Sequence, residues 1–192
     1  MFRIIDDIHL HQELLKSLVG RNLKIRYKRS VLGFFWTLLN PIFLILIYTV
    51  FLKILRFYNA EDPLFLHKLI TGIIAWQFLA MSLNDSLGAV VGNANLITKT
   101  AFPRLILPFS MTVANLVNFM LSLLILIAFM LITRVSGRFF VALPAIIATH
   151  FALCLGLSLV ISAMNVFFRD TEHILSVGLL AWFFLTPIIY PV

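Results

Sequence analysis

The sequence predicts an all-α integral membrane protein, in which an N-terminal amphipathic helix at the membrane interface precedes five transmembrane helices. Of its 192 residues, 61% are hydrophobic and only 12% are charged, whereas a soluble domain carries about 25% charged residues. The mean hydropathy is +1.04. One small core cannot bury this much apolar surface, so lipid must form part of the solvent.

Five apolar stretches account for the predicted transmembrane domain, which covers residues 31–192. A helix rises about 1.5 Å per residue, so about 20 apolar residues cross a hydrocarbon core of about 30 Å. The stretches are continuous and rich in Leu, Ile and Phe, without the alternation of membrane β-strands, which favours helices. The second stretch contains Asp85 and is long enough only if its helix continues to Gly92. The predicted spans are residues 31–55, 66–92, 105–133, 141–167 and 173–191.

Residues 1–30 form a separate basic segment without a long apolar run. Within residues 4–20, Ile4, Ile8, Leu15 and Leu18 recur at helical spacing among polar residues. This pattern predicts an amphipathic helix on the cytoplasmic face of the membrane lipid. A cytoplasmic helix packed on a protein partner is an equally open interpretation, and the two are compatible.

Basic residues are concentrated before the first span, which predicts a cytoplasmic N-terminus by the positive-inside rule. Five spans then place Lys99, Arg104 and Arg169 on the same side. Because the basic segment adjoins a span, topology explains it without a nucleic-acid partner. A phosphate- or headgroup-binding role is the alternative, and its candidates are Arg21, Lys24, Arg26, Lys28 and Arg29.

Four segments carry a resemblance to a known family. They are residues 21–42 (RNLKIRYKRSVLGFFWTLLNPI), 69–87 (LITGIIAWQFLAMSLNDSL), 93–108 (NANLITKTAFPRLILP), and 162–170 with 183–191 (SAMNVFFRD and FFLTPIIYP). In this order they resemble the membrane subunits of type-2 ABC exporters, in the branch that exports O-antigen, capsule or teichoic-acid chains. Family members usually continue past TPIIYP into an outer hairpin and a sixth span, so we expect the chain to be a fragment or a truncated form.

The resemblance implies a permease that moves a lipid-linked polysaccharide or polyol-phosphate polymer across the bacterial inner membrane. The sequence has no G-x-x-x-x-G-K-[ST] phosphate loop, so ATP would be bound by a separate cytoplasmic ATPase and the permease would need no cofactor. It would act as a homodimer, because one chain lines only half a pathway. The alternatives are a drug or lipid exporter of the same superfamily and, with less support from the scattered carboxylates, a membrane-bound transferase.

The connection between the second and third spans is the first candidate for ATPase docking. Residues 93–99 are expected to form a short helix capped by Asn93, ended by Pro103 before the third span. After the fourth span, Arg169 and Asp170 are expected to form a surface ion pair. The docking candidates are Asn95, Thr98, Lys99, Phe102, Pro103, Arg104, Arg169 and Asp170.

Aromatic and polar residues share helical faces in two predicted spans. Aromatic rings stack on sugars, although they also favour membrane interfaces and lipid. In the fifth span the spacing i, i+4, i+8 puts three such residues in one stripe, with Phe183 about 100° away. The substrate-path candidates are Trp36, Asn40, Phe43, Trp76, Trp182, Thr186 and Tyr190.

Several polar or small residues lie inside the predicted spans. Asp85 is costly in lipid and must face protein or water, near the cytoplasmic end of its span. The same question applies to Asn115, Asn118 and His150, although one Asp and one His do not make a proton relay. Two pairs of small residues in the fourth span predict close helix packing, and these are Ala152 with Gly156 and Ser158 with Ser162.

Overall fold

The computed structural model describes residues 12–27, 35–54, 64–99, 102–135 and 139–188, apart from the side chains at positions 27, 52, 53, 139 and 140. Over these residues the regular structure is entirely helical, which confirms the predicted all-α fold class. The helices are α2 (Gln12–Tyr27), α3 (Phe35–Ile54), α4 (Phe65–Leu87), the 3₁₀ helix η1 (Val91–Asn93), α5 (Ala94–Lys99), α6 (Ile106–Ile132), α7 (Phe139–Phe167) and α8 (Thr171–Leu185).

Three of these helices are long and apolar enough to cross a membrane, and two more are apolar but shorter. The long spans are Phe65–Leu87, Ile106–Ile132 and Val141–Phe167, and the shorter apolar helices are Phe35–Phe51 and Thr171–Leu185. Each of the five overlaps one of the stretches that the sequence marks as spans. The structure therefore describes a multi-pass membrane protein.

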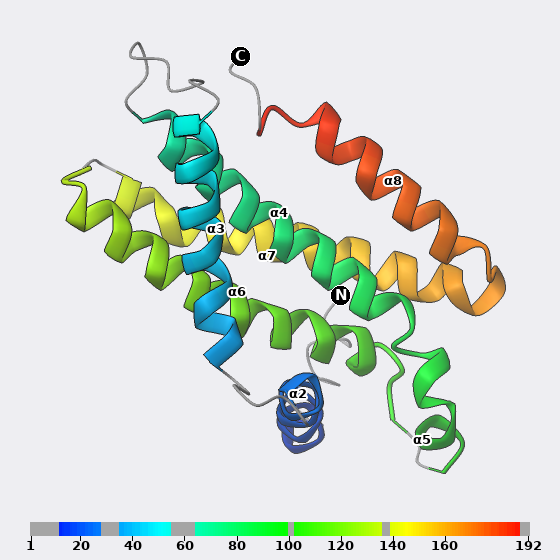
Figure 1. Cartoon of the computed structure of the whole chain (residues 1–192). Helices are drawn as coiled ribbons and strands as arrows, with labels where there is room; N and C mark the ends of the chain where they lie inside the picture. Colours follow the sequence, from blue (N-terminus) through cyan, green and yellow to red (C-terminus); the bar gives the residue numbers. More distant parts are fainter. Residues whose placement is uncertain (1–11, 28–34, 55–63, 100–101, 136–138, 189–192) are drawn as a thin grey trace.

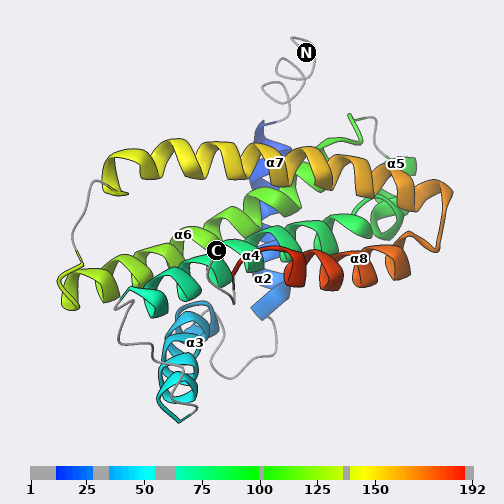
Figure 2. The ribbon, with the colours of Figure 1, turned by 90° about the horizontal axis from the view of Figure 1, so that it is seen from above.

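Helix α4 is the centre of the bundle. It contacts α3, α6, α7 and α8, and Figure 2 shows it between α7 on one side and α8 on the other. Leu69, Ile70, Ile73 and Ile74 are buried on it at helical spacing. Outer positions of the surrounding helices are exposed and apolar, as at Leu124 and Ile174, which suits contact with lipid.

The connecting segments fall at two ends of the bundle. Helix α5 and the turn between α7 and α8 lie at one end, and α2 crosses the bundle beside the start of α6 (Figures 1 and 2). The end of α6 and the start of α7 lie at the opposite end. This arrangement agrees with a threading in which α2, α5 and the α7–α8 turn share one side of the membrane.

Most hydroxyl side chains in the helices donate hydrogen bonds to backbone carbonyls of their own helix. Thr49, Thr71 and Ser122 each donate a hydrogen bond to the carbonyl four residues earlier, at 2.6, 2.7 and 3.1 Å. A hydroxyl that bonds its own backbone needs no water. These residues therefore fit into apolar spans at little cost.

Two helix ends differ from the predicted spans. Helix α4 stops at Leu87, before the predicted limit at Gly92, because Gly88 follows and the Ala89 N–H turns back to the carbonyl of Ser86 at 3.1 Å. Helix α8 stops at Leu185, and Thr186 is extended with φ −85° and ψ 132°. A residue that precedes proline avoids the helical conformation, and residue 187 is proline.

The segment after α8 returns to the central helix. A Cβ added to Gly72 of α4 would lie 3.0 Å from Cγ2 of Ile188. The missing side chain thus allows the chain after α8 to pack directly against α4. This contact holds the segment that follows α8 against α4.

Only one of the two small-residue pairs in α7 faces a neighbouring helix of the chain. Ser158 and Ser162 are buried, and the Ser158 hydroxyl donates to the carbonyl of Ser82 in α4 at 3.2 Å. Ala152 is exposed, and nothing lies within 4 Å of a Cβ added at Gly156. The packing prediction is confirmed for Ser158, whereas Ala152 and Gly156 meet no other helix of the described chain, so for that pair it stays a prediction.

Candidate functional site

A pocket lined by both apolar and polar side chains lies between α2, α3, α4 and α6. Its volume is about 280 Å³, which suits a small group such as a sugar ring or a headgroup, and it contains a guanidinium, several amides and aromatic rings. Each of the four helices contributes part of the wall. The lining residues are Arg26, Trp36, Thr37, Asn40, Ile74, Gln77, Phe78, Met81, Asn115, Asn118, Phe119 and Ser122.

The pocket brings together residues that the sequence assigned to different roles. Trp36 and Asn40 were substrate-path candidates, and Arg26 was a phosphate or headgroup candidate. Phe43 is not among the lining residues, but its ring centroid is 6.5 Å from that of Trp36. Gln77 was not predicted from the sequence as a pocket residue. The feature that could have identified it is an uncharged amide next to a tryptophan inside an apolar span.

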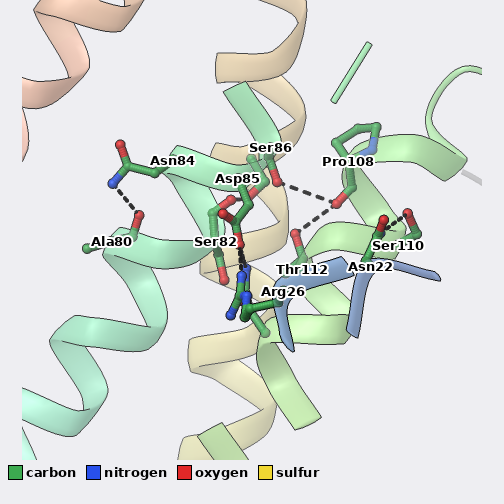
Figure 3. Close-up of polar contacts among 12 residues, drawn as sticks. Asn22, Arg26, Ala80, Ser82, Asn84, Asp85, Ser86, Pro108, Ser110 and Thr112 are labelled. Carbon is green, nitrogen blue, oxygen red and sulfur yellow. Dashed lines mark hydrogen bonds and ion pairs between the residues drawn. The ribbon is translucent and has the colours of Figure 1, made fainter. Parts of the chain in front are cut away.

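Asp85 of α4 forms an ion pair with Arg26 of α2 (Figure 3). The same carboxylate oxygen, Oδ2, accepts a hydrogen bond of 2.8 Å from Nδ2 of Asn115 in α6. The sequence predicts that Asp85 faces protein or water, and this contact identifies the protein partner. The sequence contained two features from which this ion pair could have been predicted. A carboxylate lies inside one span and a guanidinium lies just before another, and charged groups at membrane depth pair with each other.

Helix α2 is anchored on the bundle through its apolar face. Leu18 is only 4% exposed and belongs to one buried cluster with Ala89, Ile106 and Leu107. Its polar residue Asn22 donates to the hydroxyl of Ser110 at 3.3 Å (Figure 3). Of the amphipathic helix predicted over residues 4–20, residues 4–11 lie outside the described residues. The described part belongs to α2, and its apolar face packs on the bundle of the same chain, not on lipid or on a separate partner.

The predicted helix after residue 93 is present as α5, but its cap is not. Oδ1 of Asn93 accepts a hydrogen bond of 2.8 Å from Arg21 of α2, and its Nδ2 donates to the carbonyl of Ala89 at 2.8 Å. The capping prediction is therefore wrong, because both polar atoms of the Asn93 side chain bond elsewhere. The residue instead joins the docking segment to α2.

Some of the docking candidates around α5 are exposed and others are half-buried. Phe102 is half-buried and packs on the cluster beneath α2, and Pro103 is also half-buried. The exposed members offer amide, hydroxyl and cationic groups, and these members are Asn95, Thr98, Lys99 and Arg104.

The turn from α7 to α8 is held by a hydroxyl. Within the described chain no ion pair joins Arg169 to Asp170, so that prediction is wrong; both residues are exposed. The buried hydroxyl of Thr171 donates to the carbonyl of Phe168 at 2.6 Å. This bond fixes the turn locally, and the two charged side chains remain at the surface.

The aromatic stripe predicted on the fifth span is interrupted. Thr186 lies past the end of α8 and its hydroxyl donates to the carbonyl of Trp182 at 2.8 Å, while Tyr190 lies outside the described residues. Ring centroids of Trp182 and Phe183 lie 6.0 and 5.4 Å from that of Trp76 in α4. Trp182 and Phe183 therefore meet the same tryptophan, so Phe183 does not lie on a separate face as expected.

Lys24 is exposed on α2, whereas Lys28 and Arg29 lie outside the described residues. The ring of His150 in α7 packs against both Phe78 and Phe119, which stack on each other, and its Nε2 is 3.1 Å from the carbonyl oxygen of Ala75. These contacts give His150 a packing role. Across the described residues, no group of three or more His, Cys, Asp and Glu side chains gathers to hold a metal ion.

A bundle of apolar helices with a pocket between four of them and a short surface helix between two spans defines a multi-pass membrane protein. The chain belongs to the ABC-2 type transporter family, whose model matches residues 13–192. It is 36% identical over 192 residues to the O-antigen export system permease protein RfbA of Myxococcus xanthus, covering 100% of this chain and 73% of the relative. Two proteins of the same name from Klebsiella pneumoniae are 34% and 32% identical over 180 residues, covering 93% of this chain and 69% of each relative.

Proposed function

We propose that the protein is the permease subunit of an ABC exporter that moves a lipid-linked polysaccharide or polyol-phosphate polymer across the bacterial inner membrane. The observation that carries the proposal is the similarity along the whole chain to permeases named for O-antigen export. The resemblance seen in the sequence points to the same branch of the family. Membership of the family implies an ATPase partner.

The pocket supports the glycan part of the proposal. Trp36 and Phe119 offer ring faces, and Asn40 and Gln77 offer amides that donate to and accept from hydroxyl groups. Mixed lining of this kind recognises sugars without requiring a net charge. The guanidinium of Arg26 adds a cation for an acidic or phosphorylated group.

The ATPase docks, in this proposal, on α5 and the segment that follows it. Lys99 and Arg104 supply exposed cations, while Phe102 transmits displacement into the cluster beneath α2. Arg21 joins α2 to Asn93, so α2 moves with the docking segment. Two copies of the chain assemble around one pathway, with α2 and α5 on the cytoplasmic side.

The test is deletion of the gene in its host, followed by re-expression of the wild-type or Trp36→Ala protein. The proposal expects lipid-linked glycan to accumulate inside the deletion strain and to be missing from its surface. Wild-type protein should restore surface glycan, and the variant should restore less. Normal surface glycan with increased drug sensitivity would instead support the drug-exporter alternative, and complete absence of polymer would support a transferase.

A further inference from the structure

The ion pair between Arg26 and Asp85 leaves part of the guanidinium without a hydrogen-bond acceptor. One oxygen of Asp85 receives both Arg26 and Asn115, whereas the strongest guanidinium–carboxylate pairs use two parallel hydrogen bonds. Nη1 of Arg26 is buried and meets no acceptor among the described residues. A buried donor without an acceptor is unfavourable, so the guanidinium has binding capacity that Asp85 does not use.

Arg26 is also accessible from the pocket. Arg26 forms part of the pocket wall, and the side chains of Arg26 and Asp85 remain 26% and 34% exposed. The carboxylate neutralises the only charged residue among those that line the pocket within the described chain. A ligand group that reaches Arg26 therefore competes with Asp85 for the same cation.

The chemistry that best replaces Asp85 is a phosphate or diphosphate. Such a group offers three or more oxygens in the geometry that a guanidinium fork matches. It satisfies Nη1 as well as the Nη2 that Asp85 now holds. A neutral sugar offers no charge to exchange, so it leaves the ion pair intact.

We propose that Asp85 is the internal counter-ion of an anion site at Arg26, and that the phosphate group of a ligand displaces it from the guanidinium. The proposal deepens the exporter function and rests on it for the nature of the ligand. Asp85 acts through Arg26 and is a positioning residue. It keeps the pocket neutral when no anion is present and makes anion binding an exchange of partners.

The structure provides a reporter for this exchange, because Trp36 lines the same pocket as Arg26. Purified protein is titrated with farnesyl diphosphate, with farnesol as the uncharged control and inorganic pyrophosphate as the lipid-free control. Tryptophan fluorescence is followed, and Trp36→Phe identifies the signal that comes from the pocket. Binding of pyrophosphate alone would support a site for free phosphate, and binding only of farnesyl diphosphate would support one for lipid-borne phosphate.

Asp85→Asn should bind farnesyl diphosphate about three- to tenfold more tightly than the wild type, because it removes the competing charge from a partly exposed pair. Arg26→Gln should lose the binding. Lys68→Gln, which removes an exposed cation near the other end of α4, should bind as the wild type does, and farnesol should respond equally in every variant. The double variant Arg26→Gln/Asp85→Asn replaces the pair by two neutral amides; its melting temperature should be close to wild type while its anion binding stays lost.

Unchanged or weaker binding in folded Asp85→Asn would overturn the counter-ion role, as would wild-type binding by Arg26→Gln or by the double variant. If Asp85→Asn does not fold, the double variant still decides whether Arg26 is the anion site. These binding results are independent of export. Normal surface glycan in the deletion strain, together with the predicted binding series, would refute the exporter and leave the anion site standing.

Discussion

Truncation of Leu18 tests how α2 is attached to the transmembrane bundle. The side chain is 4% exposed and is buried together with Ala89, Ile106 and Leu107. Removing a buried leucine to alanine costs about 2–5 kcal/mol. At the lower limit of about 2 kcal/mol, the population in which α2 is detached rises about 30-fold, since about 1.4 kcal/mol corresponds to a factor of ten. We therefore expect Leu18→Ala to release α2 locally.

Hydrogen–deuterium exchange measures that release directly, because amides in α2 exchange when the helix detaches. In Leu18→Ala, exchange in residues 12–27 should accelerate by about 30-fold or more, while α4 and α6 stay protected. Ile25→Ala is the matched control, since Ile25 is on the same helix and 60% exposed. If Ile25→Ala accelerates exchange and Leu18→Ala does not, the apolar face of α2 lies in lipid and the packing argument fails.

Three further results are expected. Ser158→Leu should lower the melting temperature by about 2–12 °C, because overpacking the α4–α7 contact costs about 1–3 kcal/mol. Ala163→Leu, on the exposed side of α7, should change the melting temperature little. Equal effects of the two substitutions would refute the packing of Ser158 against α4. Phe102→Ala should reduce co-purification of the ATPase without unfolding the bundle, and retention of the full complex would move the docking site elsewhere. Trp76→Ala should reduce export while assembly persists, and unimpaired export would exclude the tryptophan cluster from the substrate path.

Much of the fold follows from the sequence because apolar length and charge placement act locally. Stretches free of charge become helices whatever their partners are, since lipid requires every backbone group to be bonded within the segment. The charge at Asp85 likewise demanded a polar partner. Family resemblance added the class of protein, and the family match agrees with it.

The pairings could not be read from the sequence because they depend on the packing of distant segments. Arg26 and Asp85 are 59 positions apart, and any of several basic residues before the first span satisfied the same rule. Ala152–Gly156 and Ser158–Ser162 have the same spacing, yet only the second pair faces α4. The helix that was expected to carry the stripe on the fifth span ends at Leu185 for a local reason that the sequence did contain, namely the proline that follows Thr186.

We propose that this chain is the permease of a glycan exporter powered by a separate ATPase. Its most direct test uses inside-out membrane vesicles that contain the chain, its ATPase and a lipid-linked glycan on the outer surface. On addition of ATP, we expect the glycan to become protected from added glycosidase, and vesicles lacking either protein to show no protection. Glycan that stays fully accessible with ATP and both proteins present would refute the proposed export function.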